Sequence, residues 1–200
     1  MKAINASGKI KLIPNTEYDV INASGKVKCE GSVRAKSVAV NGKIKIDGDL
    51  LVSGDINITG KAKVGSVSCK DFNGIGGIDM SSISAKNVIV VISNDCRIEK
   101  IISEEAVEVG KKENSLLEDK VAQSFLNLLN IDFDYGKCKE AAKLYVDEIV
   151  GNNVRLDNVV AKSVIGNNII IGKNCYIETV KYNDEINIDE TSKVNIVEKQ

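Results

Sequence analysis

The sequence predicts an all-β protein, a three-sided parallel β-helix in which very short strands stack into a solenoid. Two observations carry this prediction: a six-residue repeat with glycine at a fixed place, and the return of longer segments at intervals of one or several coils. A third observation agrees with them. Aromatic residues make up only 4% of the 200 residues and Trp is absent, which favours thin layers of aliphatic side chains.

The six-residue repeat is clearest over 42–65, which reads GKIKID, GDLLVS, GDINIT and GKAKVG. Its glycines stand six residues apart, at Gly42, Gly48, Gly54 and Gly60. Apolar residues follow two and four places after each glycine, and alternate side chains of a strand point to the same side. Each hexad is therefore expected to form a bend at glycine and a short strand with two inward side chains.

Longer repeats extend this pattern over most of the chain. The segment INASGKI at 4–10 returns as INASGKV at 21–27, an interval that fits one three-sided coil of about eighteen residues. The tetrad that begins at Ala35 returns at Ala85 and again at Ala161. The first of these intervals is close to three coils, and the second exceeds three coils by roughly 25 residues. A further pair, GNNV and GNNI, begins at residues 151 and 166.

The extra residues are assigned to an insertion. Between residues 113 and 135 the alternating pattern stops, and apolar residues recur at helical spacing: Leu117, Val121, Phe125 and Leu128. This stripe predicts an amphipathic helix over 115–130, which packs on the flank of the rod, covers one of its ends or docks a partner. The expected organisation is one domain of roughly ten coils, with coils over 1–111, a helical insertion over 112–140 and further coils over 141–200.

Two stretches carry a family resemblance. One is the glycine-spaced run over 21–67, and the other is the run over 146–182, which contains IIIGKNCYI at 169–177. Both resemble the bactofilins, the polymer-forming bacterial cytoskeletal proteins, and the second resembles the longer, two-part bactofilin-like proteins of Gram-positive bacteria. The resemblance implies a right-handed β-helix that polymerises end to end without nucleotide. The partners it implies are further copies of the chain, other bactofilins or cell-envelope proteins.

The ends of such a solenoid are the expected assembly sites. Terminal coils of a β-helix expose backbone N–H and C=O groups that lack partners, and soluble solenoids usually hide them under a polar cap. No cap is evident before Ile4, and only three residues follow Val197. We expect the end coils to pair with other copies and build a homopolymer through the apolar residues Ile4, Ile10, Val194 and Ile196.

Residue composition argues against an enzyme. Histidine is absent, which removes Ser-His-Asp and Cys-His nucleophile systems and His metal sites. We predict no catalytic, cofactor-binding or metal-ligating residue. The five cysteines form no Cys-x-x-Cys pair and are expected to be buried thiols in a reducing cytoplasm: Cys29, Cys69, Cys96, Cys138 and Cys175.

Charge and hydropathy limit the expected partners. The 27 basic and 28 acidic residues leave a net charge of −1, so no nucleic-acid partner is expected. No signal peptide opens the chain and no apolar run approaches the roughly 18 residues of a membrane helix, so a cytoplasmic location is expected and membrane contact stays open. Lysines that alternate with inward residues are interpreted as a solvated face that discourages sideways aggregation: Lys26, Lys28, Lys36, Lys43 and Lys45.

Two alternative functions remain open from the sequence. The first is an enzyme on a β-helix. Residues 165–177 resemble the hexapeptide repeats of acyltransferases, and carboxylates for sugar cleavage could come from Asp47, Asp49, Asp55, Asp147, Glu148 and Asp157. The second is a monomeric adaptor that uses the inserted helix.

The glycine-rich run over 74–77 lacks the Gly-Lys-Ser/Thr of a phosphate loop and is interpreted as a local break in the solenoid.

Overall fold

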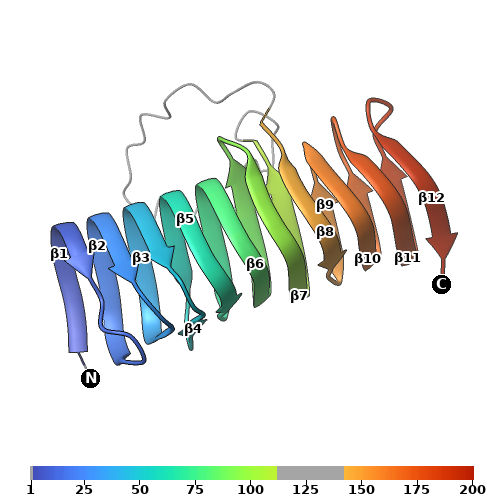
Figure 1. Ribbon diagram of the computed structural model, residues 1–200. Helices are drawn as coiled ribbons and strands as arrows, with labels where there is room; N and C mark the ends of the chain where they lie inside the picture. Colours follow the sequence, from blue (N-terminus) through green and yellow to red (C-terminus); the bar gives the residue numbers. More distant parts are fainter. Residues whose placement is uncertain (1, 112–141) are drawn as a thin grey trace.

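The chain winds into a straight rod of stacked coils. The computed structural model describes residues 2–111 and 142–200, which form a β-solenoid of about ten turns with 79% of the residues in strands (Figure 1). The two chain ends lie at opposite ends of the rod. The predicted all-β parallel solenoid is thus confirmed. The predicted helix over 115–130 lies outside the described residues.

One parallel sheet contains every described strand, and its order follows the chain with β9 placed between β7 and β10. Strand β7 pairs with both β8 and β9, so the coils on either side of residues 112–141 belong to the same sheet. The strands are β1 (Lys2–Lys11), β2 (Glu17–Cys29), β3 (Val33–Ile46), β4 (Leu50–Val52), β5 (Ile56–Ser68), β6 (Asp71–Ile92), β7 (Cys96–Gly110), β8 (Leu144–Val150), β9 (Asn153–Leu156), β10 (Val159–Ile171), β11 (Tyr176–Ile188) and β12 (Lys193–Lys199).

The register of the sheet confirms the repeats seen in the sequence. Ile4 lies opposite Ile21, so the two INASGK segments stack directly on each other. The two GNN segments also stack, and their side chains form a ladder in which Asn167 donates to Asn152 at 2.6 Å and Asn168 donates to Asn153 at 3.1 Å. Stacking of identical residues thus explains why whole segments return along the chain.

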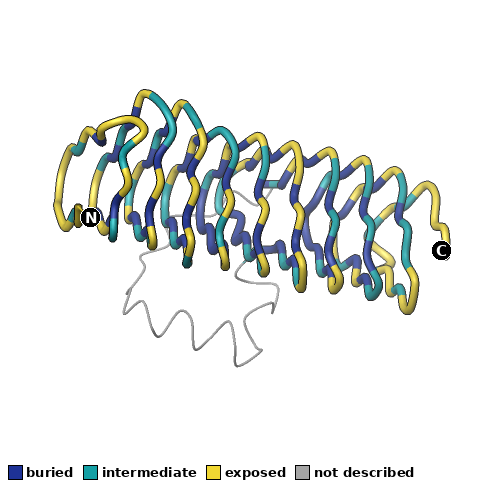
Figure 2. Tube along the Cα trace, turned by 90° about the horizontal axis from the view of Figure 1, so that it is seen from below, coloured by how far each residue is buried: buried dark blue, intermediate teal, exposed yellow. Residues whose placement is uncertain are grey.

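The core is a set of straight apolar columns inside the coils. One column runs Ile10, Val27, Ile44, Ala62 and Ile78, each opposite the next in the sheet. From Val27 onward these side chains are at most 3% exposed. Buried residues line the interior along the whole rod, while exposed residues cover its outside and its ends (Figure 2). Burial of aliphatic side chains in each coil supplies the main stabilising free energy.

A column of glycines runs along the rod within its strands. Gly8, Gly25, Gly42, Gly60 and Gly76 stack in register, and all have positive φ angles. A Cβ atom at Gly60 would lie 2.1 Å from the carbonyl oxygen of Gly42, so only glycine allows the coils to approach this closely. The predicted bend is confirmed at Gly48 and Gly54, which lie in the bends that separate β3, β4 and β5. Gly42 and Gly60 lie within β3 and β5 instead, where their positive φ angles allow the close approach of the coils.

The run over 74–77 corrects one expectation. We expected a local break in the solenoid there, but β6 runs without interruption from Asp71 to Ile92. Gly76 continues the glycine column above Gly60, and Ile78 continues the apolar column above Ala62. The hexad pattern lapses because the coil from Gly60 to Gly76 is shorter than the preceding one, from Gly42 to Gly60.

Candidate functional site: the two ends of the solenoid

The N-terminal end of the described rod is strand β1. It is the first strand of the sheet order and pairs with β2. Ile4 and Ile10 lie opposite Ile21 and Val27 and pack against the core, yet both remain partly exposed. The structure thus places these two predicted residues together on the inner side of the end coil, where a further coil would cover them.

The C-terminal end is strand β12, which pairs with β11. Val194 lies opposite the fully buried Ile177 and packs against the core, as an inward residue should. Ile196 is half exposed and lies opposite Thr179, which in turn lies opposite Ser163. Of the two predicted residues at this end, Val194 therefore continues an apolar column and Ile196 continues a polar one.

Two further apolar residues at this end were missed by the sequence reasoning. Ile188 lies opposite Ile171 and Val197 lies opposite Val180, and both partners are fully buried. Ile188 and Val197 themselves are 37% and 44% exposed, because no further coil covers them in the described structure. The signal was available, since each follows its buried partner by the same interval that separates the two INASGK segments.

Polar contacts hold the last coil against its neighbour. Lys181 and Glu198 form an ion pair at 3.0 Å, and the Lys193 ammonium lies 5.7 Å from the centre of the Tyr176 ring. Hydrogen bonds from the hydroxyl and the backbone N–H of Thr191 lower the pKa of Asp189. Exposed pairs of this kind stabilise little individually, but together they order the coil that presents the edge.

The open edges define what the two ends can do. A parallel ladder uses the N–H and C=O groups on both sides of a strand. Within 2–111 and 142–200, β1 pairs only with β2 and β12 only with β11, so each presents unpaired backbone groups on its outer side. Another strand can pair there and cover the exposed apolar residues in the same step. The ends are therefore suited to adding coils from another molecule.

The other predicted contact surface cannot be placed. The stripe of Leu117, Val121, Phe125 and Leu128 lies outside the described residues. In the described ranges, no helix is long and apolar enough to cross a membrane.

Five of the six candidate carboxylates have structural partners in the described residues, among them Asp49, which accepts the backbone N–H of Ser66 at 3.1 Å. Asp47, Asp147 and Glu148 form ion pairs with Lys45, Lys162 and Lys100 respectively. The buried Asp157 accepts the backbone N–H of Lys173 at 2.6 Å and so shapes a turn. Across residues 2–111 and 142–200, no group of three or more His, Cys, Asp or Glu residues is arranged to hold a metal ion.

The described cysteines are poor nucleophiles. Cys29, Cys96 and Cys175 are buried and Cys69 is partly buried, and all four are free thiols. Burial raises the pKa of Cys69 to about 12 and the pKa values of Cys96 and Cys175 to about 11. Thiols react as thiolates, so these side chains are unreactive near neutral pH.

This assignment predicts the labelling behaviour of the folded protein. In a Cys138→Ser background, which leaves only the four described cysteines, a thiol-reactive dye at pH 8 is expected to label essentially no thiol in the folded state. In denaturant all four should react within minutes, since unfolding restores an ordinary thiol pKa. Rapid labelling of two or more thiols in the folded state would contradict the packing described above.

Comparisons with known proteins add no relative. No family model matches the chain, and neither a curated protein nor a solved structure does.

Proposed function

We propose that this protein is a structural scaffold that assembles end to end into nucleotide-independent filaments, like the bactofilins that its repeats resemble. The observation that supports the proposal is the pair of open sheet edges. Each edge combines unpaired backbone groups with core-type side chains that are still partly exposed: Ile4 and Ile10 on β1, and Ile188, Val194 and Val197 on the C-terminal coil.

The energetics favour stacking over an isolated rod. Each fully buried aliphatic side chain stabilises an interface by about 1.5–3 kcal/mol, and each ladder hydrogen bond adds about 1 kcal/mol. Joining β1 of one copy to the C-terminal coil of another would bury several such side chains and form a row of such bonds. Association itself costs about 4–15 kcal/mol, so a full strand of contacts is needed at each joint.

We also propose that each coil is three-sided and right-handed, as the resemblance implies. From the sequence pattern we propose further that the segment over 115–130 forms a helix that packs on the flank of the rod, covers one of its ends or docks a partner, and that the filament is cytoplasmic. None of the proposed steps involves catalysis or a cofactor.

Sedimentation velocity of the purified protein tests the proposed function. Without nucleotide, we expect species much larger than the 21.6 kDa chain, in proportions that grow with protein concentration. Added ATP or GTP should leave the distribution unchanged, because assembly rests on strand pairing alone. A single monomeric species from micromolar to near-millimolar concentration would overturn the proposal.

A further inference from the structure

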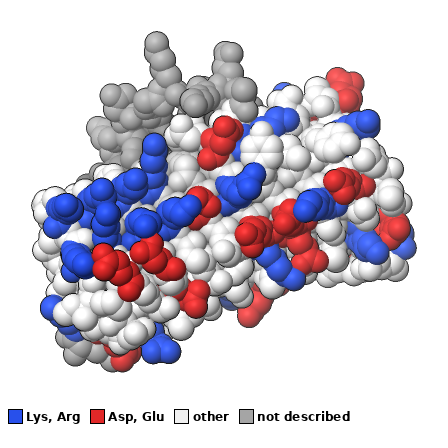
Figure 3. All heavy atoms as spheres, in the orientation of Figure 1, with Lys and Arg blue, Asp and Glu red and all other residues white. Residues whose placement is uncertain are grey.

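Two straight columns of lysine run along the outside of the N-terminal coils. The sheet register aligns their members residue by residue, and the intervening residues point into the core. Both columns lie on the β1–β5 part of the rod, where Figure 3 shows basic side chains gathered on one face. The first lysine column is Lys9, Lys26, Lys43 and Lys61, and the second lysine column is Lys11, Lys28, Lys45 and Lys63.

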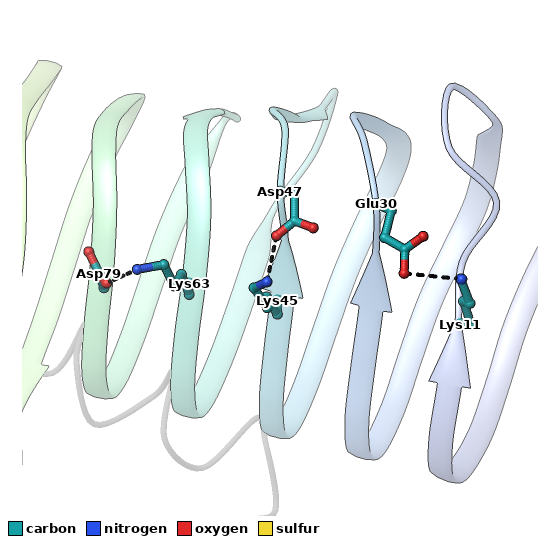
Figure 4. A network of polar contacts seen from close by, with 6 residues as sticks. All are labelled: Lys11, Glu30, Lys45, Asp47, Lys63 and Asp79. Atoms are coloured by element: carbon teal, nitrogen blue, oxygen red, sulfur yellow. Dashed lines mark hydrogen bonds and ion pairs between the residues drawn. The ribbon is translucent and has the colours of Figure 1, made fainter.

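The two columns differ in how their charge is balanced. Three members of the second lysine column form ion pairs with carboxylates at 2.8–3.1 Å (Figure 4): Lys11 with Glu30, Lys45 with Asp47, and Lys63 with Asp79. Within residues 2–111 and 142–200, no carboxylate forms an ion pair with the first lysine column. The pKa of Lys26 is lowered, first by repulsion from Lys28, then by burial, and then by repulsion from Lys43 and Lys9. Among the described residues, the first lysine column is therefore a line of uncompensated positive charge.

The near-neutral net charge of the chain hides an uneven distribution of basic and acidic residues along it. Residues 2–65 carry ten lysines and one arginine against six carboxylates, and the excess of acid lies in the rest of the chain. A net charge summed over the chain does not describe what a partner meets, because a partner contacts only one face of the rod. The fold places eight of these ten lysines in the two columns.

A recess opens where the first lysine column ends. Lys61 lies opposite Gly77, which has no side chain, and the groove above it has a volume of about 700 Å³. The basic side chains that line it are Lys43, Lys45, Lys61, Lys63 and Arg97. The two carboxylates in the groove already have partners, since Asp79 pairs with Lys63 and Asp95 accepts the backbone N–H of Lys143 at 3.2 Å. With five basic side chains against two carboxylates, the recess extends the positive charge of the column.

We propose that the first lysine column and this recess form a docking site for a linear polyphosphate chain. Four stacked strands place its four charges in a line about 14 Å long, which suits a chain of phosphates rather than a single anion. A planar bilayer surface cannot enter the recess. Of the described residues that line the recess, Tyr145 is the one aromatic side chain, whereas surfaces that bind single-stranded nucleic acid offer several aromatic rings for base stacking.

Calorimetric titration with inorganic polyphosphate of about 45 units tests the column. Wild-type protein should bind, with an affinity that falls steeply as salt rises. The variant K9Q/K26Q/K43Q/K61Q is expected to bind about a hundredfold more weakly and to lower the slope of log affinity against log salt by about 3. The control K36Q/K86Q/K100Q/K162Q removes the same charge from lysines paired with carboxylates elsewhere, and should lose less than about threefold. Equal losses in the two variants, or no binding by wild type, would overturn the proposal.

The recess is tested separately by two substitutions at Gly77. A Cβ atom there would meet its nearest neighbour, the Cβ of Asn94, at 3.6 Å, which is ordinary contact, so both variants should fold. Gly77→Ala should bind polyphosphate like wild type, and Gly77→Asp should bind about tenfold more weakly, because its carboxylate faces the anion. If the quadruple lysine variant proves unstable, the two Gly77 variants still test whether polyphosphate binds at this surface. Equal polyphosphate affinity of Gly77→Ala and Gly77→Asp would count against binding in the recess.

The same titrations distinguish the class of ligand. An oligothymidylate of matched charge and vesicles containing anionic lipid should bind more weakly than polyphosphate. Tighter binding of either one, lost in K9Q/K26Q/K43Q/K61Q, would assign the surface to nucleic acid or to a membrane instead and overturn the polyphosphate proposal.

Discussion

Gly60→Ala is expected to lower the free energy of unfolding by about 3 kcal/mol or more. The added methyl group would lie 2.1 Å from the carbonyl oxygen of Gly42, and φ at this position is +117°. The methyl carbon is bonded directly to the backbone and the oxygen is part of it, so neither can move without disturbing the ladder on both sides. Chemical denaturation monitored by circular dichroism measures the change.

Two matched variants separate the causes of this loss. At Gly8 the φ angle is +92°, but no atom lies within 4 Å of an added methyl group. Gly8→Ala therefore reports backbone strain alone and should lower the free energy of unfolding by about 1–2 kcal/mol. Gly77→Ala has neither the strained φ nor a close contact, and should change stability by less than about 1 kcal/mol. If Gly60→Ala were no worse than Gly8→Ala, the close stacking of the glycine column would be wrong.

Ile188→Lys is expected to weaken assembly about a hundredfold, equivalent to about 3 kcal/mol at each joint. Its side chain continues a buried column at the open C-terminal end and would be covered by the next copy. A lysine there must bury its charge or leave the joint open, and both cost free energy. In the monomer the position is 37% exposed, so the coil itself should remain folded. Sedimentation velocity over a concentration series measures how far the protein concentration needed for assembly rises.

Ile170→Lys is the matched control. Ile170 is 46% exposed on β10, so the substitution makes the same chemical change away from the open ends. It should leave the assembly curve of the wild type unchanged. An equal shift from both substitutions would mean that the rods associate through their sides rather than their ends.

The repeat made the fold predictable, since its signals are local. Glycine at fixed spacing and alternate apolar residues mark bend and strand within one hexad, and the INASGK repeat fixes which residues stack. The lengths of individual coils were harder to predict. The coil from Asn153 to Asn168 is shorter than the coil from Val38 to Ile56, and nothing within one hexad records that difference.

The assembly residues were predictable only in part for the same reason. Ile4, Ile10 and Val194 follow apolar columns that the alternating pattern within single coils shows, whereas Ile188 and Val197 are recognised only when the interval between the two INASGK segments is applied at the C-terminal end. The basic face was missed for a different reason. Lys43 and Lys61 are a full coil apart in the sequence and become neighbours through stacking, so a charge sum over the chain cannot reveal them.

Cryo-electron microscopy of assemblies formed without nucleotide tests the end-to-end arrangement most directly. Strands stack about 4.8 Å apart along the rod, so filaments built by joining the ends should give a layer line at about 4.8 Å on the meridian, along the filament axis. Bundles of rods lying side by side across the axis would instead place that reflection on the equator. Such a pattern, or a field of separate rods at every concentration, would contradict assembly through β1 and the C-terminal coil.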